Sequence, residues 1–116
     1  MDVVQRRKRQ RDEQTMNKQV LDSIVHALGR YGKSTPEIVF WNLRESQGLK
    51  EEDILRYPEK FVQSLQKMFG IGTKTIETVI IREIKSTIPE LRDAGGESLV
   101  LVLKEARAQD QRNREF

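Results

Sequence analysis

The chain has 116 residues, of which 34% are charged, 36% are hydrophobic and none is cysteine. This length favours one domain and excludes a large enzyme with a cleft between two lobes. Without cysteine there is no disulfide or thiolate metal site, and a single histidine excludes a zinc site built on several histidines. No apolar run approaches the roughly 20 residues of a membrane span, and the first residues lack the apolar region of a signal peptide. We therefore expect a soluble, cytoplasmic protein without a cofactor, a metal or a membrane partner.

The net charge of +3 belongs to the start of the chain. Residues 1–19 hold six basic and three acidic side chains, whereas 20–90 hold ten of each and 91–116 five of each. Residues 1–15 lack apolar periodicity after Val4, which predicts a disordered basic arm. Its cationic residues are Arg6, Arg7, Lys8, Arg9 and Arg11. They attract nucleic acid or acidic surfaces, or they serve only as a solubilising tail.

Helical spacing of apolar residues begins at Met16 and continues to Leu28, and Gly29 and Gly32 end this first helix. The sequence Ser34-Thr35-Pro36-Glu37 predicts a second helix, with Ser34 as its N-cap and Glu37 as the capping-box partner. Trp41 is the expected anchor of the core. Gly48 suits the left-handed residue that ends a helix, after which Leu49 would fold back onto the core.

The second half of the chain predicts further helices and no strands. A short turn at 50–55 is broken at Tyr57-Pro58, and a helix then runs to Gly70-Ile71-Gly72. Another follows to Ile88-Pro89, and a last one starts near Glu97 and frays over 111–116. The expected fold is an all-α bundle of four or five helices in one domain over 16–110, with a Gly-x-Gly turn between two of the helices.

Nothing in the chain predicts catalysis. The lone His26 has no identifiable partner and is expected at the surface. Glu51, Glu52 and Asp53 lack the alternating oxygen ligands and the glycine of an EF-hand loop, so they are expected to be solvated acids at a helix start. No nucleotide-binding fingerprint is present, because Gly72-Thr73-Lys74-Thr75 lacks the spacing of a phosphate-binding loop. We expect neither an enzyme nor a small-molecule substrate.

The segment from Leu65 to Ile81 resembles the helix-hairpin-helix motif of DNA repair and replication proteins. The likeness rests on Leu65, Met68, Gly70, Ile71, Gly72, Lys74, Ile76, Val79 and Ile80. It implies phosphate binding by the turn and by the start of the second helix, through Gly70, Ile71, Gly72, Thr73, Lys74 and Thr75. Phe69 replaces the proline and Ile76 the small alanine that are usual in that motif. The competing interpretation is a plain connection in which Gly70 caps a helix and Ile71 fills the core.

A longer resemblance covers about Val20 to Ile88. Asp53-Ile54, Pro58-Glu59-x-Phe61, Leu65, Phe69-Gly70-x-Gly72 and Lys74-x-Ile76-Glu77 are together similar to the Nitrosopumilus-type output domain of archaeal signal-transduction proteins. The resemblance implies a helical fold and a regulatory context, without catalytic residues. The chain differs from that family in its basic arm and in its additional C-terminal helix.

Two functions follow from these patterns. The first is a non-enzymatic helical regulatory module that binds a protein partner or a second copy of itself. Its candidate interface is the C-terminal stripe Leu99, Val100, Val102, Leu103 and Ala106, which equally suits closure of the core. The alternative is a nucleic-acid-binding protein without sequence specificity, which uses the Gly70–Thr75 turn and the basic arm.

Overall fold

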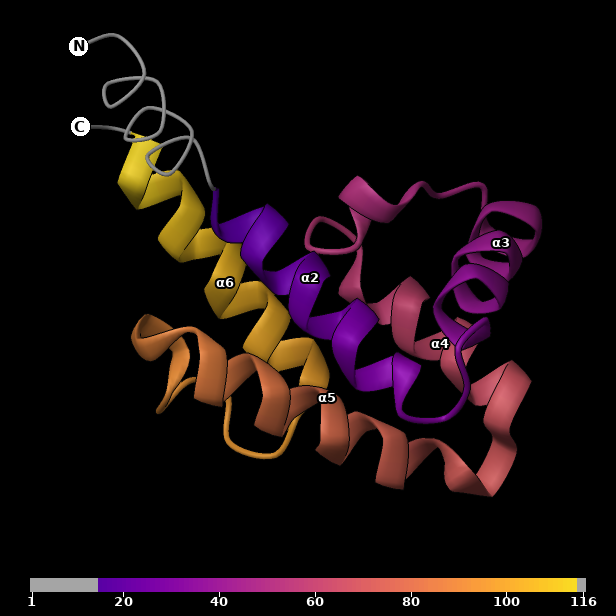
Figure 1. Ribbon diagram of the computed structural model, residues 1–116. Helices are drawn as coiled ribbons and strands as arrows, with labels where there is room; N and C mark the ends of the chain where they lie inside the picture. The colour runs from indigo at the N-terminus through magenta and orange to yellow at the C-terminus, as the bar shows by residue number, and fades with distance from the viewer. Residues whose placement is uncertain (1–14, 115–116) are drawn as a thin grey trace, which may run out of the picture.

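The computed structural model describes residues 15–114, and in this range the protein is all-helical, which confirms the predicted fold class. Figure 1 shows the arrangement of its helices. The elements are α2 (Met16–Gly29), α3 (Thr35–Gln47), η1 (Glu51–Asp53), α4 (Pro58–Phe69), η2 (Gly70–Gly72), α5 (Thr73–Thr87), η3 (Pro89–Leu91) and α6 (Leu99–Arg114). Helix α2 packs against α5, α6 and α3, and α4 packs against α3 and α6.

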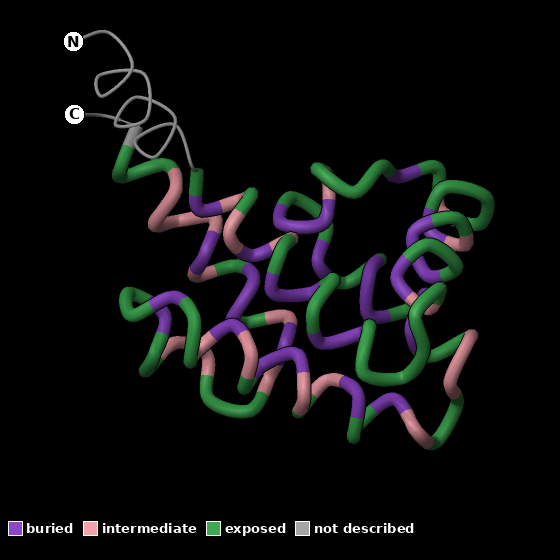
Figure 2. Tube along the Cα trace, in the orientation of Figure 1, coloured by how far each residue is buried: buried purple, intermediate pink, exposed green. Residues whose placement is uncertain are grey.

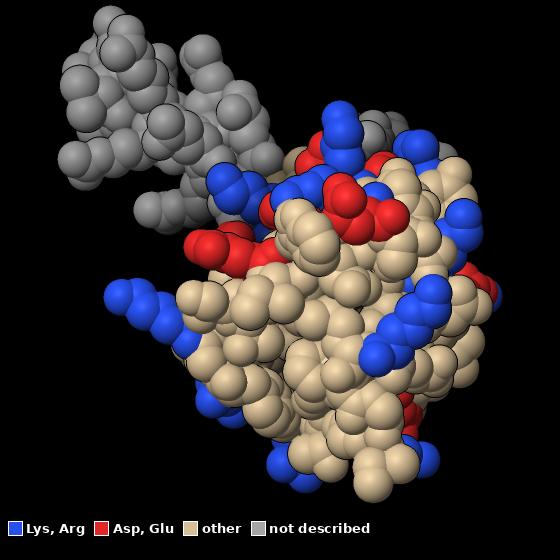
Figure 3. Space-filling view, turned by 90° about the vertical axis from the view of Figure 1, so that its right-hand side faces the viewer, with Lys and Arg blue, Asp and Glu red and all other residues tan. Residues whose placement is uncertain are grey.

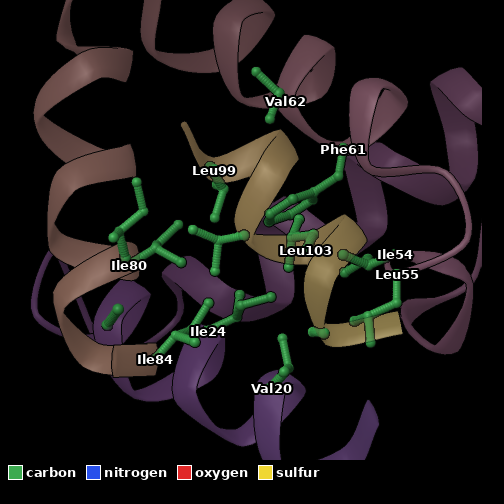
Figure 4. Close-up of a cluster of buried hydrophobic side chains, with 14 of the residues drawn as sticks. Val20, Ile24, Ile54, Leu55, Phe61, Val62, Ile80, Ile84, Leu99 and Leu103 are labelled. Atoms are coloured by element: carbon green, nitrogen blue, oxygen red, sulfur yellow. The ribbon is translucent and has the colours of Figure 1, made fainter. Parts of the chain in front are cut away.

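One hydrophobic core joins all five α-helices (Figure 2). Phe61 of α4 points toward Leu99 and Leu103 of α6, and Ile24, Ile80 and Ile84 lie beside them (Figure 4). The largest fully buried side chains are Phe61, Ile24, Leu28, Leu43, Ile54, Leu65, Ile80, Ile84, Ile88, Leu91, Leu99 and Leu103. Nearly all are aliphatic, so the core is stabilised by close packing and by burial of apolar surface. No ion pair among the described residues is buried in it.

Local signals set most helix ends as expected. Gly48 adopts the left-handed conformation with φ 66°, its N–H donates to the Arg44 carbonyl, and buried Leu49 folds back with its N–H on the Leu43 carbonyl. This confirms the predicted end of α3. At the start of α2, the Lys18 N–H donates to the Thr15 hydroxyl over 3.1 Å.

One expected helix cap was wrong, and the last helix is longer than expected. Ser34 makes no side-chain cap, because its backbone is helical (φ −94°, ψ 0°) and not extended as an N-cap residue requires. The last helix begins at Leu99, with the Leu101 N–H donating to the Ser98 hydroxyl over 3.2 Å. It remains helical to Arg114, beyond the point where fraying was expected.

The loop before α6 depends on a close approach of two backbone segments. Gly95 has φ +61°, and a Cβ placed on it would lie 2.4 Å from the Val102 backbone nitrogen. Only glycine fits at this position, because any side chain would collide with the first turn of α6. The loop therefore fixes where α6 enters the core.

Candidate functional site

The turn between α4 and α5 is stabilised by hydrogen bonds on its buried side. Gly70 has φ +54° and ψ −126°, and its N–H donates to the Gln66 carbonyl, so it caps α4. The buried Thr73 hydroxyl lies 2.7 Å from the Gly70 carbonyl oxygen and 3.2 Å from that of Leu65. Thr73 was predicted to contact phosphate. Its hydroxyl instead bonds to the turn itself, so in this fold it positions the turn and does not face a ligand.

The outer side of the same turn faces solvent. Ile71 is fully exposed, at 104% of its reference area, so the expectation that it fills the core was wrong. Lys74 and Thr75 are also exposed, and an added Cβ on Gly72 would meet no atom within 4 Å. The turn thus presents Ile71 and the first residues of α5 outward. The backbone from α4 to α5 is that of two helices joined by a tight turn that contains glycine.

The acids nearest to Lys74 in the sequence do not crowd it. Glu77 is partly buried, and this burial raises the pKa of its carboxyl, while the positive charge of Lys74 acts in the opposite direction. Glu83 is 14% exposed, and its oxygens lie 3.0 Å from Arg30 Nη2 and 3.1 Å from His26 Nδ1. Glu83 is therefore neutralised by α2, whereas Glu77 lies one turn from Lys74 and interacts with it electrostatically.

His26 and the acidic cluster have structural surroundings. His26 is exposed, as expected, and it pairs with Glu83, a partner that the sequence did not identify. In the acidic cluster, the Asp53 carboxylate accepts the Lys50 N–H over 3.1 Å, which caps η1, and Glu51 lies 3.9 Å from Arg44. Across residues 15–114, no group of three or more acidic or histidine side chains is placed to hold a metal ion.

The C-terminal stripe closes the core. Leu99, Val102, Leu103 and Ala106 are all completely buried, and Val100 is partly buried. They occupy this position because α2, α4 and α5 all pack around α6. Of the two roles that the sequence left open, these side chains take the core role, so they offer no surface to a partner in this fold.

A different apolar surface lies between α2 and α3. Trp41 is 56% exposed, so its expected role as core anchor was wrong, and Phe40 is buried in its place. Ile38 is 53% and Val25 41% exposed. These three line an open hollow of about 710 Å³, here called the α2–α3 groove. Its full lining is Val25, Lys33, Pro36, Glu37, Ile38, Phe40, Trp41, Arg44 and Glu51.

The sequence contained a signal for this groove. The segment 38–43 carries five apolar side chains, which is more than the inward face of one short helix can hold. Val39, Phe40 and Leu43 share the inner face, leaving Ile38 and Trp41, three residues apart, on the outer face. Helical spacing alone does not say which of the two sets faces inward.

The remaining predictions concern the basic arm and membrane spans. Comparison with known proteins found no match. The basic residues Arg6–Arg11 lie outside the described residues. Within the described part of the chain, no helix is both long and apolar enough to cross a membrane. No protein-family model matches the chain. No curated protein and no solved structure matches it either.

Proposed function

We propose that this protein is a non-enzymatic helical interaction module that pairs with a second copy of itself through the α2–α3 groove. The observation that carries this proposal is the joint exposure of Trp41, Ile38 and Val25 in one hollow. Single exposed apolar residues are ordinary on protein surfaces, whereas several that share one concave surface are typical of interaction sites. Tryptophan is also among the residues most enriched in binding hot spots.

The residues that line the groove are suited to binding a partner and do not form a catalytic arrangement. Its lining contains no serine, threonine or histidine, so no nucleophile with a neighbouring base is formed there. Five of its lining residues are apolar, and the charged ones, here called the rim, are Lys33, Glu37, Arg44 and Glu51. Figure 3 looks onto the side of the molecule where α3 lies. Much of this face is uncharged, most of its acidic side chains lie toward the upper edge, and basic side chains lie at that edge and around the other edges. An apolar centre with a charged rim is the usual anatomy of a protein interface.

The charges at the rim favour a second copy as the occupant. Lys33 and Arg44 are cationic, and Glu37 and Glu51 are anionic, so the rim sums to zero. In a twofold dimer the same surface faces itself, and a rim of one sign would repel its copy. Arg44 and Glu51 already lie 3.9 Å apart within one chain, so in such a dimer Lys33 can face Glu37 of the other chain.

The energetics predict a weak dimer. An enclosed tryptophan side chain buries about 150–250 Å², so covering the exposed half of Trp41 removes roughly 100 Å² from water and contributes about 2–3 kcal/mol. Each of the two chains contributes this amount, with less from Ile38 and Val25. Association itself costs about 4–15 kcal/mol, which offsets most of the gain. We therefore expect a dissociation constant in the micromolar range or weaker.

The test uses Trp41 as a built-in probe, since it is the one tryptophan of the chain. Sedimentation equilibrium from micromolar to millimolar concentration should show a monomer–dimer transition. The tryptophan emission should shift to shorter wavelength over the same range, because pairing removes the indole from water.

Ile38→Ser and Leu101→Ser form a matched pair of variants, since both side chains are 53% exposed and Leu101 of α6 is not part of the groove. Ile38→Ser should weaken dimerisation at least tenfold, and Leu101→Ser should leave it unchanged. A chain that stays monomeric at millimolar concentration with constant emission would overturn the proposal. Equal effects of the two variants would place the interface elsewhere and would also overturn it.

A further inference from the structure

The exposed side of α5 carries only cations and hydroxyls. Its members are the exposed Lys74, Thr75, Thr78, Arg82 and Ser86, together with the partly buried Lys85. At 100° per residue these six side chains fall within one third of the helix circumference, opposite the buried Ile76, Ile80 and Ile84. We call this surface the α5 basic face. Both acids of the helix, Glu77 and Glu83, lie outside it.

The cations of this face are available for an external anion. Within residues 15–114, none of Lys74, Arg82 and Lys85 lies within ion-pair distance of a carboxylate. Glu83 is engaged by Arg30 and His26 of α2, as described above. The body of the chain is neutral in sum. Of the two acids of α5, Glu83 pairs with α2, and Glu77 lies one turn from Lys74 and interacts with it electrostatically.

A neighbouring loop extends the face. Arg92, Gly96 and Glu97 join Thr78, Ile81, Arg82, Lys85 and Ser86 around an open hollow of about 610 Å³. Lys85 Nζ lies 2.9 Å from the Gly96 carbonyl oxygen, which ties the loop to α5 and orients the ammonium group at the hollow. The lining holds three cations and one carboxylate, that of Glu97. The net charge of the hollow is therefore positive.

We propose that the α5 basic face binds the phosphate backbone of double-stranded nucleic acid without sequence specificity. Lys74, Arg82, Lys85 and Arg92 carry the contacts. Lys74 and Lys85 are eleven residues apart, which is about 17 Å along the helix axis. A duplex carries one phosphate charge per about 1.7 Å of its axis with both strands counted, so a 17 Å length holds about ten of them, more than the four cations can contact. The hydroxyls of Thr78 and Ser86 donate to carbonyls of their own helix at 3.0 and 3.1 Å, so the cations and not the hydroxyls supply the attraction.

The make-up of the face favours a duplex over other polyanions. Binding of single strands relies on aromatic side chains that stack on bases, and the α5 basic face has none. Helices that lie on lipid combine basic residues with a large apolar side that enters the bilayer. The apolar side of α5 is instead buried in the core. The short hydroxyl residues between the cations let the longer side chains reach past them.

The test is fluorescence anisotropy of the full chain with a labelled 20-base-pair duplex over a range of salt concentrations. Lys74→Gln with Arg82→Gln removes two phosphate contacts and should weaken binding roughly 50-fold at 0.1 M salt, with the log–log salt slope reduced in magnitude by about 1.8. The matched control is Lys50→Gln with Arg56→Gln. This control variant has the same net charge as the Lys74→Gln, Arg82→Gln variant and also changes exposed residues. Its two positions lie in the segment around η1, at the edge of the molecule opposite α5 in Figure 1. This control should change affinity less than twofold.

Each other outcome would overturn the proposal. Equal loss of affinity in both variants would mean that overall charge or the basic arm carries binding. Tighter binding to a single strand of the same length, or to vesicles of anionic lipid, would assign the face to another polyanion. No binding of duplex at low salt would exclude nucleic acid. Amide shifts on duplex addition should be largest between Lys74 and Ser86, and shifts confined to residues elsewhere would contradict the assignment independently of affinity.

Discussion

His26 Nδ1 lies 3.1 Å from Glu83 Oε2, so a side chain of α2 and a side chain of α5 meet across the edge of the core. The second oxygen of the same carboxylate lies 3.0 Å from Arg30 Nη2. Glu83 is mostly covered, whereas both of its partners are more than half exposed. The carboxylate therefore joins the two helices and at the same time withdraws a negative charge from the surface of α5.

Replacing Glu83 by Gln should lower the free energy of unfolding by about 1 kcal/mol. The loss is modest because Arg30 and His26 remain hydrated. Urea unfolding followed by circular dichroism would measure it. Glu90→Gln changes an exposed acid with no ion pair among the described residues, and it should stay within about 0.5 kcal/mol of the parent chain. Equal effects would show that the pairing with α2 has no energetic value.

Leu103→Ala should destabilise the fold by about 2–5 kcal/mol, because Leu103 is fully buried against neighbouring helices and its truncation leaves a cavity. Leu101→Ala, two residues away and 53% exposed, should cost less than about 1 kcal/mol. Denaturant midpoints of the two variants would be compared. If Leu103→Ala were as stable as Leu101→Ala, the C-terminal stripe would have to lie on the surface.

Gly95→Ala should lower stability by more than about 2 kcal/mol, since the new Cβ would lie 2.4 Å from the Val102 nitrogen in a backbone conformation that already disfavours alanine. Gly96 provides the control. It has φ +55° but open space around a Cβ, so Gly96→Ala should cost only the conformational penalty of about 1 kcal/mol. Thermal unfolding of both variants would separate the collision from the conformational strain. Matching losses would contradict the close approach.

Thr73→Val should loosen the turn at Gly70. The variant keeps the shape of the buried side chain but removes the hydroxyl that donates to the Gly70 and Leu65 carbonyls, at a cost of about 1–2 kcal/mol. Thr73→Ser retains the hydroxyl and should recover most of the loss. Hydrogen exchange of the amides at 70–75 should accelerate in the valine variant alone. Protection that survives in that variant would argue against this role.

The Glu59 carboxyl should titrate below its ordinary range. The hydrogen bond from Lys104 Nζ, at 2.9 Å, is the main cause that lowers the pKa of Glu59. A lowered carboxyl pKa means that the pair favours folding above the unfolded pKa and that this contribution is lost as pH falls through the folded pKa. Side-chain carboxyl NMR would follow the titration.

Lys104→Gln should return the pKa of Glu59 toward its ordinary value. Glu77 supplies an internal reference, because burial raises the pKa of Glu77, so it should titrate at higher pH than Glu59. A Glu59 titration that is the same with and without Lys104 would contradict the pairing.

The sequence predicted the helices well because their apolar spacing and their ends carry local information. Gly48 with Leu49 is an example, since the left-handed residue and the returning leucine are both specified within a few positions. Ser34 shows the limit of such signals. The residue type was right for a cap, but the turn from Gly32 to Thr35 placed its backbone in a conformation that cannot form one.

The surfaces were harder to predict because they depend on which side of each helix meets the others. Trp41 and Phe40 are adjacent in the sequence and similar in character, and only the packing of α3 on α4 and α2 decides that Phe40 is inside. The charge of α5 posed a different difficulty. The charges of residues 20–90 sum to zero, whereas the rotation of each side chain about the helix places Lys74, Arg82 and Lys85 on one side and turns Glu83 toward α2.

The antiparallel course of α2 and α6 has a practical consequence. The start of α2 and the end of α6 lie at the same edge of the molecule in Figure 1, because the two helices pack side by side. A short linker between residues 15 and 114 would therefore make a circular permutant without crossing the core. New termini could open in the exposed stretch Tyr31–Lys33, which contributes no core residue. Such a permutant would place a reporter at the rim of the α2–α3 groove while preserving every helix.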